Sequence, residues 1–92
     1  MYDVFIAHSN KDKRFAEKLF YALSNKFKPF LSSKSLLVGD KWNEAIPMAQ
    51  ECAQATLLIV SKHTPDAFYQ QEEITFAIDL SRRSDASHRV IP

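Results

Sequence analysis

The apolar run Ala-Thr-Leu-Leu-Ile-Val at residues 55–60 limits most strongly what this chain can fold into. Apolar side chains at consecutive positions mean that both faces of a strand made from this run must be covered. Central strands of parallel sheets have this composition, because helices pack on both faces of such a sheet. We therefore predict that Leu57, Leu58, Ile59 and Val60 are almost fully buried in a central strand.

Three shorter apolar segments predict further strands, at residues 2–7, 29–31 and 89–91. The segments between them have helical periodicity, so the order of elements is βαβαβαβ. This order predicts an α/β fold with a three-layer parallel sheet and right-handed crossovers. No helix follows the last strand to cover it, so we expect residues 1–92 to form one domain that is incomplete at its C-terminus.

Two of the helices have clear sequence signals. The first is predicted over residues 12–26, with Asn10 or Asp12 as its cap. The other is expected to end near Arg83, with Thr64 and Pro65 as its cap and first-turn proline. The apolar residues of the first helix recur at spacings of three and four: Phe15, Ala16, Leu19, Phe20, Leu23 and Phe27.

The middle of the chain has weaker signals. A polar loop is predicted from Ser32 to Asp40, and it contains the only glycine, Gly39. Asp40 can cap a helix that Trp42 is predicted to anchor in the core. Pro47 lies within this helix and is expected to kink it or shorten it, because proline lacks the backbone donor that a helix needs.

The composition excludes several classes of function. The net charge is +1, from 12 basic and 11 acidic residues spread along the chain, so no field for nucleic acid or an anionic membrane is expected. The single Cys52 fits a reducing compartment, and the chain shows no signal peptide and no membrane span, so we expect a cytoplasmic protein. One glycine is too few for a nucleotide-binding glycine loop, and the histidines lack metal-ligand spacing, so neither a bound cofactor nor a metal is expected.

Glu73 is an acid on the apolar face of the last helix. With Tyr69 at zero and about 100° per residue, Phe76, Tyr69, Leu80, Glu73, Ala77, Ile74 and Ile78 share one broad arc, whereas Glu72 points the other way. An ionised carboxylate that is buried without a partner costs several kcal/mol. Glu73 should therefore have a cationic partner, be neutral, or line a cavity.

Four segments, taken together, resemble the Toll/interleukin-receptor (TIR) domain family, and its bacterial branch most. They occur in the family's order and spacing: Tyr2-Asp3-Val4-Phe5-Ile6-Ala7-His8-Ser9, Leu36-Leu37-Val38-Gly39-Asp40-Lys41-Trp42, the aromatic-x-x-x-Glu pattern from Tyr69 to Glu73, and His88-Arg89-Val90-Ile91-Pro92. The resemblance covers the whole chain and lacks the family's fifth strand and last helices. Two departures are Ala7 and Ser32, where the family often has Ser and an acid.

The resemblance implies a flavodoxin-like sheet with strand order 2-1-3-4-5, of which this chain holds the first four strands. In such sheets ligands bind beyond the carboxyl ends of the strands, where the order reverses, here between strands one and three. The loop after the first strand and the loop from residue 36 to 42 converge there. The substrate-binding residues expected from this are His8, Ser9, Asn10, Leu37, Gly39, Trp42 and Tyr69.

In TIR domains that cleave NAD, the glutamate of the aromatic-x-x-x-Glu pattern is catalytic, and it matches Glu73. The resemblance thus implies an NAD glycohydrolase that uses NAD as a substrate and not as a cofactor. It also implies activation by assembly with other TIR domains, a fused or associated sensor domain, and a role as an effector in bacterial anti-phage defence. Tyr69 would stack against the substrate or pack in the core. The alternative is a non-catalytic module that only recruits other TIR domains.

Overall fold

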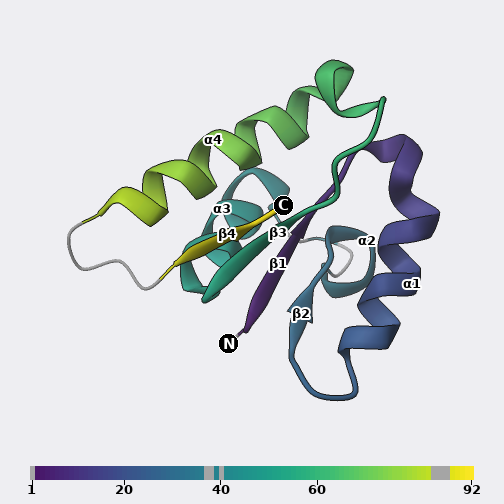
Figure 1. The fold of residues 1–92 in the computed structure, drawn as a ribbon. Helices are drawn as coiled ribbons and strands as arrows, with labels where there is room; N and C mark the ends of the chain where they lie inside the picture. Colours follow the sequence, from purple (N-terminus) through teal and green to yellow (C-terminus); the bar gives the residue numbers. More distant parts are fainter. Residues whose placement is uncertain (1, 37–38, 40, 84–87) are drawn as a thin grey trace.

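The computed structural model describes residues 2–36, 39, 41–83 and 88–92, and it forms a four-stranded parallel sheet with helices on both faces (Figure 1). The order of the strands in the sheet is β2-β1-β3-β4, as predicted for a flavodoxin-like fold. In chain order the strands are β1 (Val4–Ala7), β2 (Pro29–Phe30), β3 (Ala55–Leu58) and β4 (Arg89–Ile91). The helices are α1 (Lys13–Leu23), α2 (Ser32–Ser35), α3 (Trp42–Cys52) and α4 (Phe68–Arg82), with 3-10 turns at Asn10–Asp12 and Thr64–Asp66.

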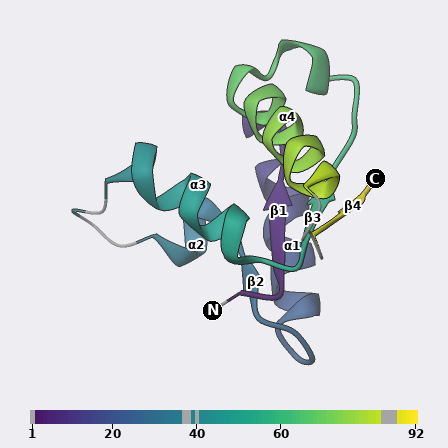
Figure 2. The same ribbon diagram turned by 90° about the vertical axis from the view of Figure 1, so that its left-hand side faces the viewer.

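Side chains of β1 alternate between the two faces of the sheet, and each face has its own core. Ile6 packs with Ala16 of α1 on one face. Phe5 packs with Ala49 and Ala53 of α3 on the other. The helix α4 also packs on the sheet and contacts β1, β3 and β4, and it lies at a steep angle to α3 when the molecule is turned (Figure 2). The sheet is thus covered from both sides, and β1 is paired with a strand on each edge.

The prediction of an almost fully buried run at residues 57–60 was wrong in part. Ile59 is only 8% exposed, but Leu57 and Leu58 are half-buried and Val60 is 65% exposed. The strand β3 ends at Leu58, so Val60 already belongs to the connection that leaves the sheet. In the described part of the chain, α1 alone covers the face of Ile6 and Ile59, and its packing lies toward β1 and β2. The side chain of Leu57 is consequently only partly covered by this helix.

The first helix is shorter and less deeply packed than its apolar pattern predicts. It begins at Lys13, after the 3-10 turn, and the Asp12 side chain makes no capping bond. Phe15 and Phe27 were expected in the apolar stripe, but they are 59% and 50% exposed. Only Ala16 is fully buried in α1, so the packed stripe is narrow.

The middle of the chain also differs from expectation. One helical turn, α2, forms inside the predicted loop. The helix α3 runs from Trp42 to Cys52 through Pro47, so the expected shortening at this proline does not occur. Trp42 is the first residue of α3 and is 55% exposed, so it does not anchor the helix in the core. The predicted cap Asp40 lies outside the described residues.

The last helix begins later than predicted, since Thr64 and Pro65 form the 3-10 turn and α4 starts at Phe68. Its end at Arg82 agrees with the prediction. Among the described helices, none is long and apolar enough to cross a membrane.

The burial of neighbouring residues 59 and 60 gives a direct test of this packing. Ile59→Ala should lower the free energy of unfolding by about 2 to 5 kcal/mol, because the core against Ala16 and Leu31 would lose methyl groups and gain a cavity. Val60→Ala is the matched control and should change the free energy of unfolding by less than about 0.5 kcal/mol, because Val60 is largely exposed. Urea unfolding of the two variants measures both values, and equal losses would contradict the packing of this strand end.

Candidate active site

The helix α4 places Glu73 toward the sheet, close to where the sequence predicted it. The buried positions of α4 are Gln70, Ala77 and Leu80, and Glu73 falls between them at helical spacing. The buried face of α4 therefore differs from the predicted arc, because Tyr69, which was expected on that arc, is 77% exposed. Tyr69 lies in the first turn of α4 and forms an edge-to-face pair with the exposed Phe68, with ring centroids 5.4 Å apart. Core packing of Tyr69 is excluded.

The Glu73 carboxyl group is partly buried and is held without a charge partner. Among the residues that the structure describes, neither a hydrogen bond nor an ion pair to this carboxyl is found. Burial is the main cause that raises the pKa of Glu73 to about 8, and the neighbouring charge of Glu72 raises it further. The Glu73 carboxyl is therefore mostly neutral at pH 7 in the free protein.

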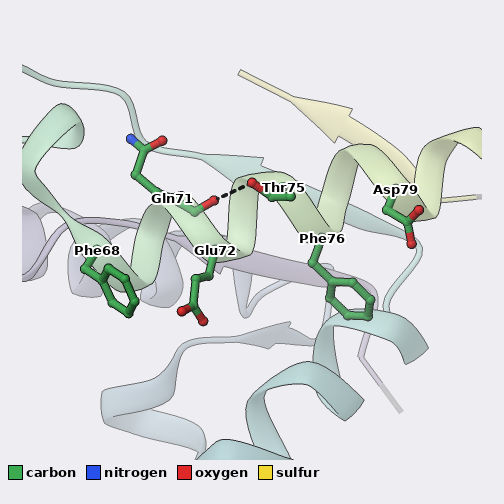
Figure 3. A pocket seen from close by; sticks show the side chains of 6 residues that line it. All are labelled: Phe68, Gln71, Glu72, Thr75, Phe76 and Asp79. Atoms are coloured by element: carbon green, nitrogen blue, oxygen red, sulfur yellow. Dashed lines mark hydrogen bonds between the residues drawn. The ribbon is translucent and has the colours of Figure 1, made fainter.

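Glu72 occupies the opposite side of α4 and faces an open hollow on the helix surface (Figure 3). Phe68, Glu72 and Phe76 point to the same side of the helix in this view. The hollow is lined by side chains of α4 alone, so no second element closes it around a ligand. We therefore do not assign chemistry to it, although it shows how differently two adjacent glutamates are placed.

The loops after β1 and β3 meet at the carboxyl edge of the sheet, and Asp12 joins them. Ser9 donates a hydrogen bond to the Asp12 carboxylate at 2.8 Å, and Ser61 donates to the same oxygen at 2.6 Å. These two bonds, followed by the charges of His63 and His8, lower the pKa of Asp12. The ionised Asp12 carboxylate therefore links the loops after β1 and β3 at the point where the strand order reverses.

Gln70 fastens the first turn of α4 to the same edge. Its side-chain amide donates to the carbonyl oxygen of Ala7 at 3.3 Å and to that of Ile59 at 2.8 Å, so one side chain contacts the ends of both central strands. Gln70 is 1% exposed, and its own carbonyl oxygen has no hydrogen-bond partner among the described residues. Glu73 follows Gln70 by three residues, or about 4.5 Å along the axis. The acid therefore lies close to the turn that Gln70 holds against the ends of β1 and β3.

The structure brings together some of the predicted substrate-binding residues. His8 and Ser9 lie at the carboxyl edge beside Asp12, and the His8 ring nitrogen Nδ1 donates to the Ser9 carbonyl oxygen at 2.6 Å. Ser9 is 3% exposed and bound to Asp12, so here it holds the loop in place. Contact of either residue with a substrate stays a prediction.

The remaining predicted residues are exposed or lie outside the described chain. Asn10 begins the 3-10 turn and is exposed, as are Trp42 and Tyr69. Gly39 is exposed with a φ of 97°, a backbone conformation that favours glycine. Leu37 lies outside the described residues.

Sequence reasoning missed several polar residues that build the site. Gln70 lies on the same helical arc as Glu73, so the pattern that singled out the acid also contained the amide. Asp12 was considered only as a helix cap. Gln50, Thr56 and His88 form a buried hydrogen-bonded group between α3, β3 and α4, and no spacing in the sequence links them. Within the described residues, no group of three or more His, Cys, Asp or Glu side chains could hold a metal ion.

Comparisons with known proteins identify the family and agree with the fold. A family model described as TIR domain matches residues 4–92. The TIR domain of the Toll-related receptor TRR-2 from Hydra magnipapillata superposes with a TM-score of 0.81 at 21% identity, over 100% of this chain and 69% of that one. The TIR domains of the activated Roq1 resistosome, which directly recognises the pathogen effector XopQ, superpose with a TM-score of 0.84 at 22% identity, over 98% of this chain and 56% of that one. A search of curated protein sequences finds no match.

The raised pKa of Glu73 predicts how stability depends on pH. The folded protein holds this proton up to about pH 8, whereas an ordinary glutamate releases it near 4.5. The stability from the neutral carboxyl is therefore fully present below pH 4.5 and is lost as pH rises through 8. We expect the free energy of unfolding to fall by up to about 1.4 kcal/mol per pH unit in this window, and Glu73→Gln to remove that slope.

Urea unfolding between pH 4.5 and 8 measures this slope. Glu72→Gln is the matched control and should keep most of the slope, because burial and not the charge of Glu72 is the main cause of the raised pKa. A wild-type slope that Glu73→Gln leaves unchanged would contradict the burial of this carboxyl.

Proposed function

The chain belongs to the TIR domain family, and from this premise we propose that it is an NAD glycohydrolase that cleaves the nicotinamide-ribose bond. The observation that carries the proposal is the partly buried carboxyl of Glu73, which has no bonding partner among the described residues and lies three residues after the Gln70 that binds the strand end. Binding sites of doubly wound sheets lie at this edge. An acid with a strongly raised pKa at such a place is a candidate for chemistry, because its burial costs stability.

The chemistry requires one carboxylate. Loss of nicotinamide develops positive charge on the ribose, through a transition state that resembles an oxocarbenium ion. An ionised Glu73 beside the ribose would stabilise that charge and accept a hydrogen bond from a ribose hydroxyl. Nicotinamide leaves as a neutral base, so no second acid is needed to protonate it. Water then bonds to C1′ of the ribose and releases a proton to the solvent, which completes the hydrolysis.

The ionisation of Glu73 would be coupled to substrate binding. In the free protein the raised pKa keeps most of the carboxyl neutral at pH 7. The nicotinamide ring of NAD carries a positive charge, and an opposite charge nearby favours the ionised form of an acid. Binding of NAD would therefore favour release of the Glu73 proton to the solvent, which generates the carboxylate that the reaction needs.

The residues around Glu73 have supporting roles in this proposal. The Asp12 carboxylate holds the loop of His8 and Ser9 beside the loop of Ser61, which would keep the carboxyl edge of the sheet in one shape. Tyr69 and Trp42 expose large aromatic surfaces at the starts of α4 and α3. Either ring would offer a stacking surface for a base of NAD or for a neighbouring subunit.

Assembly is the second part of the proposal. A sheet edge that is open to water would hold a substrate poorly, so a second copy of the domain is expected to complete the site. In the Roq1 structure, TIR domains belong to an activated resistosome that recognises a pathogen effector. By analogy, we propose that this chain is a cytoplasmic effector module of bacterial anti-phage defence, clustered by a fused or associated sensor.

A non-catalytic TIR module that recruits other TIR domains is the alternative. The exposed pair Phe68 and Tyr69 favours it, because a 68% exposed phenylalanine beside a 77% exposed tyrosine is typical of a contact surface. The two functions differ in what they require of Glu73. An association surface has no use for a buried acid.

Substitution of the two adjacent glutamates distinguishes the functions. Glu73→Gln should abolish nicotinamide release from NAD, because the transition-state charge loses its counter-charge, while the fold is retained. Glu72→Gln should be nearly silent, since Glu72 lies on the outer side of α4. Nicotinamide is measured by chromatography and the fold by circular dichroism. Equal loss in both variants would remove Glu73 from its assigned role.

Activity per chain should also depend on association. We expect the rate of nicotinamide release per subunit to rise steeply with the concentration of the full-length protein or on forced clustering, since a neighbour would shield the proposed site from water. Leu37→Asp should weaken the rise without unfolding the domain. A rate per subunit that stays constant from dilute monomer to assembled sample would contradict this requirement and leave the chemistry of Glu73 intact.

A further inference from the structure

Gln50 of α3 is a buried amide that contacts the helical turn of Glu73. It is 1% exposed, and its nitrogen Nε2 donates to the backbone carbonyl oxygen of Glu73 at 2.7 Å. In an α-helix this oxygen also accepts the bond from the residue four positions later, and a carbonyl oxygen has lone pairs for both donors. The bond from Gln50 therefore adds a fixed point to α4 without breaking the helix.

A chain of hydrogen bonds sets the orientation of the Gln50 amide. His88 donates from Nδ1 to the carbonyl oxygen of Ala53 at 2.8 Å, which leaves its Nε2 as an acceptor in the neutral ring. The Thr56 hydroxyl lies 2.7 Å from that nitrogen and donates to it. The hydroxyl oxygen in turn accepts from Gln50 Nε2 at 3.2 Å. Every donor has a partner, so the amide nitrogen of Gln50 must face α4.

All members of this chain are buried. Thr56 is 0% exposed and His88 is 8% exposed, so an amide turned the other way would bring oxygen against oxygen in a site without water to compensate. Gln70 holds the first turn of α4 to the strand ends, and Gln50 holds the next turn to α3. Between these two points, α4 can neither slide nor rotate freely.

We propose that Gln50 is a positioning residue of the Glu73 site, which holds the turn of α4 so that the Glu73 carboxyl stays withdrawn from water. This inference rests on the proposed function for its catalytic consequence. Its structural consequence, the sheltered state of the carboxyl, is independent of whether NAD is cleaved. The charged and titratable groups near this turn are Glu72 on α4, His88 ahead of β4, and the exposed Glu51 of α3, which pairs with Arg83.

Gln50→Met is the principal test, because methionine keeps the length of the side chain and lacks the donor. It should lower kcat for nicotinamide release roughly ten- to a hundredfold, since small displacements of a reacting group have effects of this size. KM should change by less than about threefold, because no substrate contact is removed. The pKa of Glu73, measured by carbon-13 NMR titration, should fall from about 8 toward its ordinary value of 4.5.

Thr56→Val is the matched control. It removes the acceptor of the weaker 3.2 Å bond, with a similar loss of stability expected. The Glu73 carbonyl oxygen can only accept a hydrogen bond, so it still holds the amide nitrogen of Gln50 toward α4 at 2.7 Å. It should keep kcat within about threefold and the raised pKa of Glu73. If Gln50→Met does not fold, Gln50→Asn replaces it, because the shorter amide cannot span to the Glu73 carbonyl.

Two results would overturn the proposal. One is a folded Gln50 variant in which Glu73 keeps its raised pKa. The other is an equal loss of kcat in the Gln50 and Thr56 variants, which would mean that both act only through stability. A wild-type protein that releases no nicotinamide would overturn the proposed function instead, and the NMR titration would still decide the role of Gln50.

Discussion

The pairing of β1 with β3 is the constraint on which the rest of the structure depends. The strands run parallel from Val4 and Ala55 to Ala7 and Leu58, and the backbone of Ile59 extends the pairing with a bond to Ala7 at 3.0 Å. Because β2 adds on the far side of β1, the chain connections leave these neighbouring strands in opposite directions across the sheet. Their loops start side by side at the carboxyl edge and then diverge, and Asp12 and Gln70 are the side chains that hold this edge together. The place of the proposed site thus follows from the strand order.

Glu73 is the feature that stability alone does not explain. An apolar side chain at its position would avoid the cost of burying an acid, and the raised pKa is the direct expression of that cost. The surrounding structure nevertheless holds α4 firmly, through Gln70 at the strand ends and Gln50 at the Glu73 carbonyl. A buried acid that lowers stability, and that neighbouring contacts nevertheless keep in position, is typical of functional sites.

The sequence predicted the architecture well because the strands and helices have different periods. The apolar run at residues 55–60 and the segments around it predicted the order of elements and the layers, and the spacing of the last helix placed Glu73 inward. The strand order in the sheet was implied by the resemblance to TIR domains and is confirmed. The errors fall on residues whose burial depends on distant partners. Val60, Phe15 and Tyr69 are apolar or aromatic, yet they lie where a strand has ended or a helix has no neighbour. Gln50, Thr56 and His88 come from three separate segments, so only the folded chain brings them together.

The pH dependence of nicotinamide release by the full-length, clustered protein tests the central claim most directly. The profile of kcat/KM reports ionisations of the free enzyme, and its acid limb should follow Glu73. We predict that nicotinamide is released and that kcat/KM rises with pH through about 8, where the buried carboxyl ionises. A profile that is already flat well below this pH, or the absence of nicotinamide release at every pH, would contradict the account.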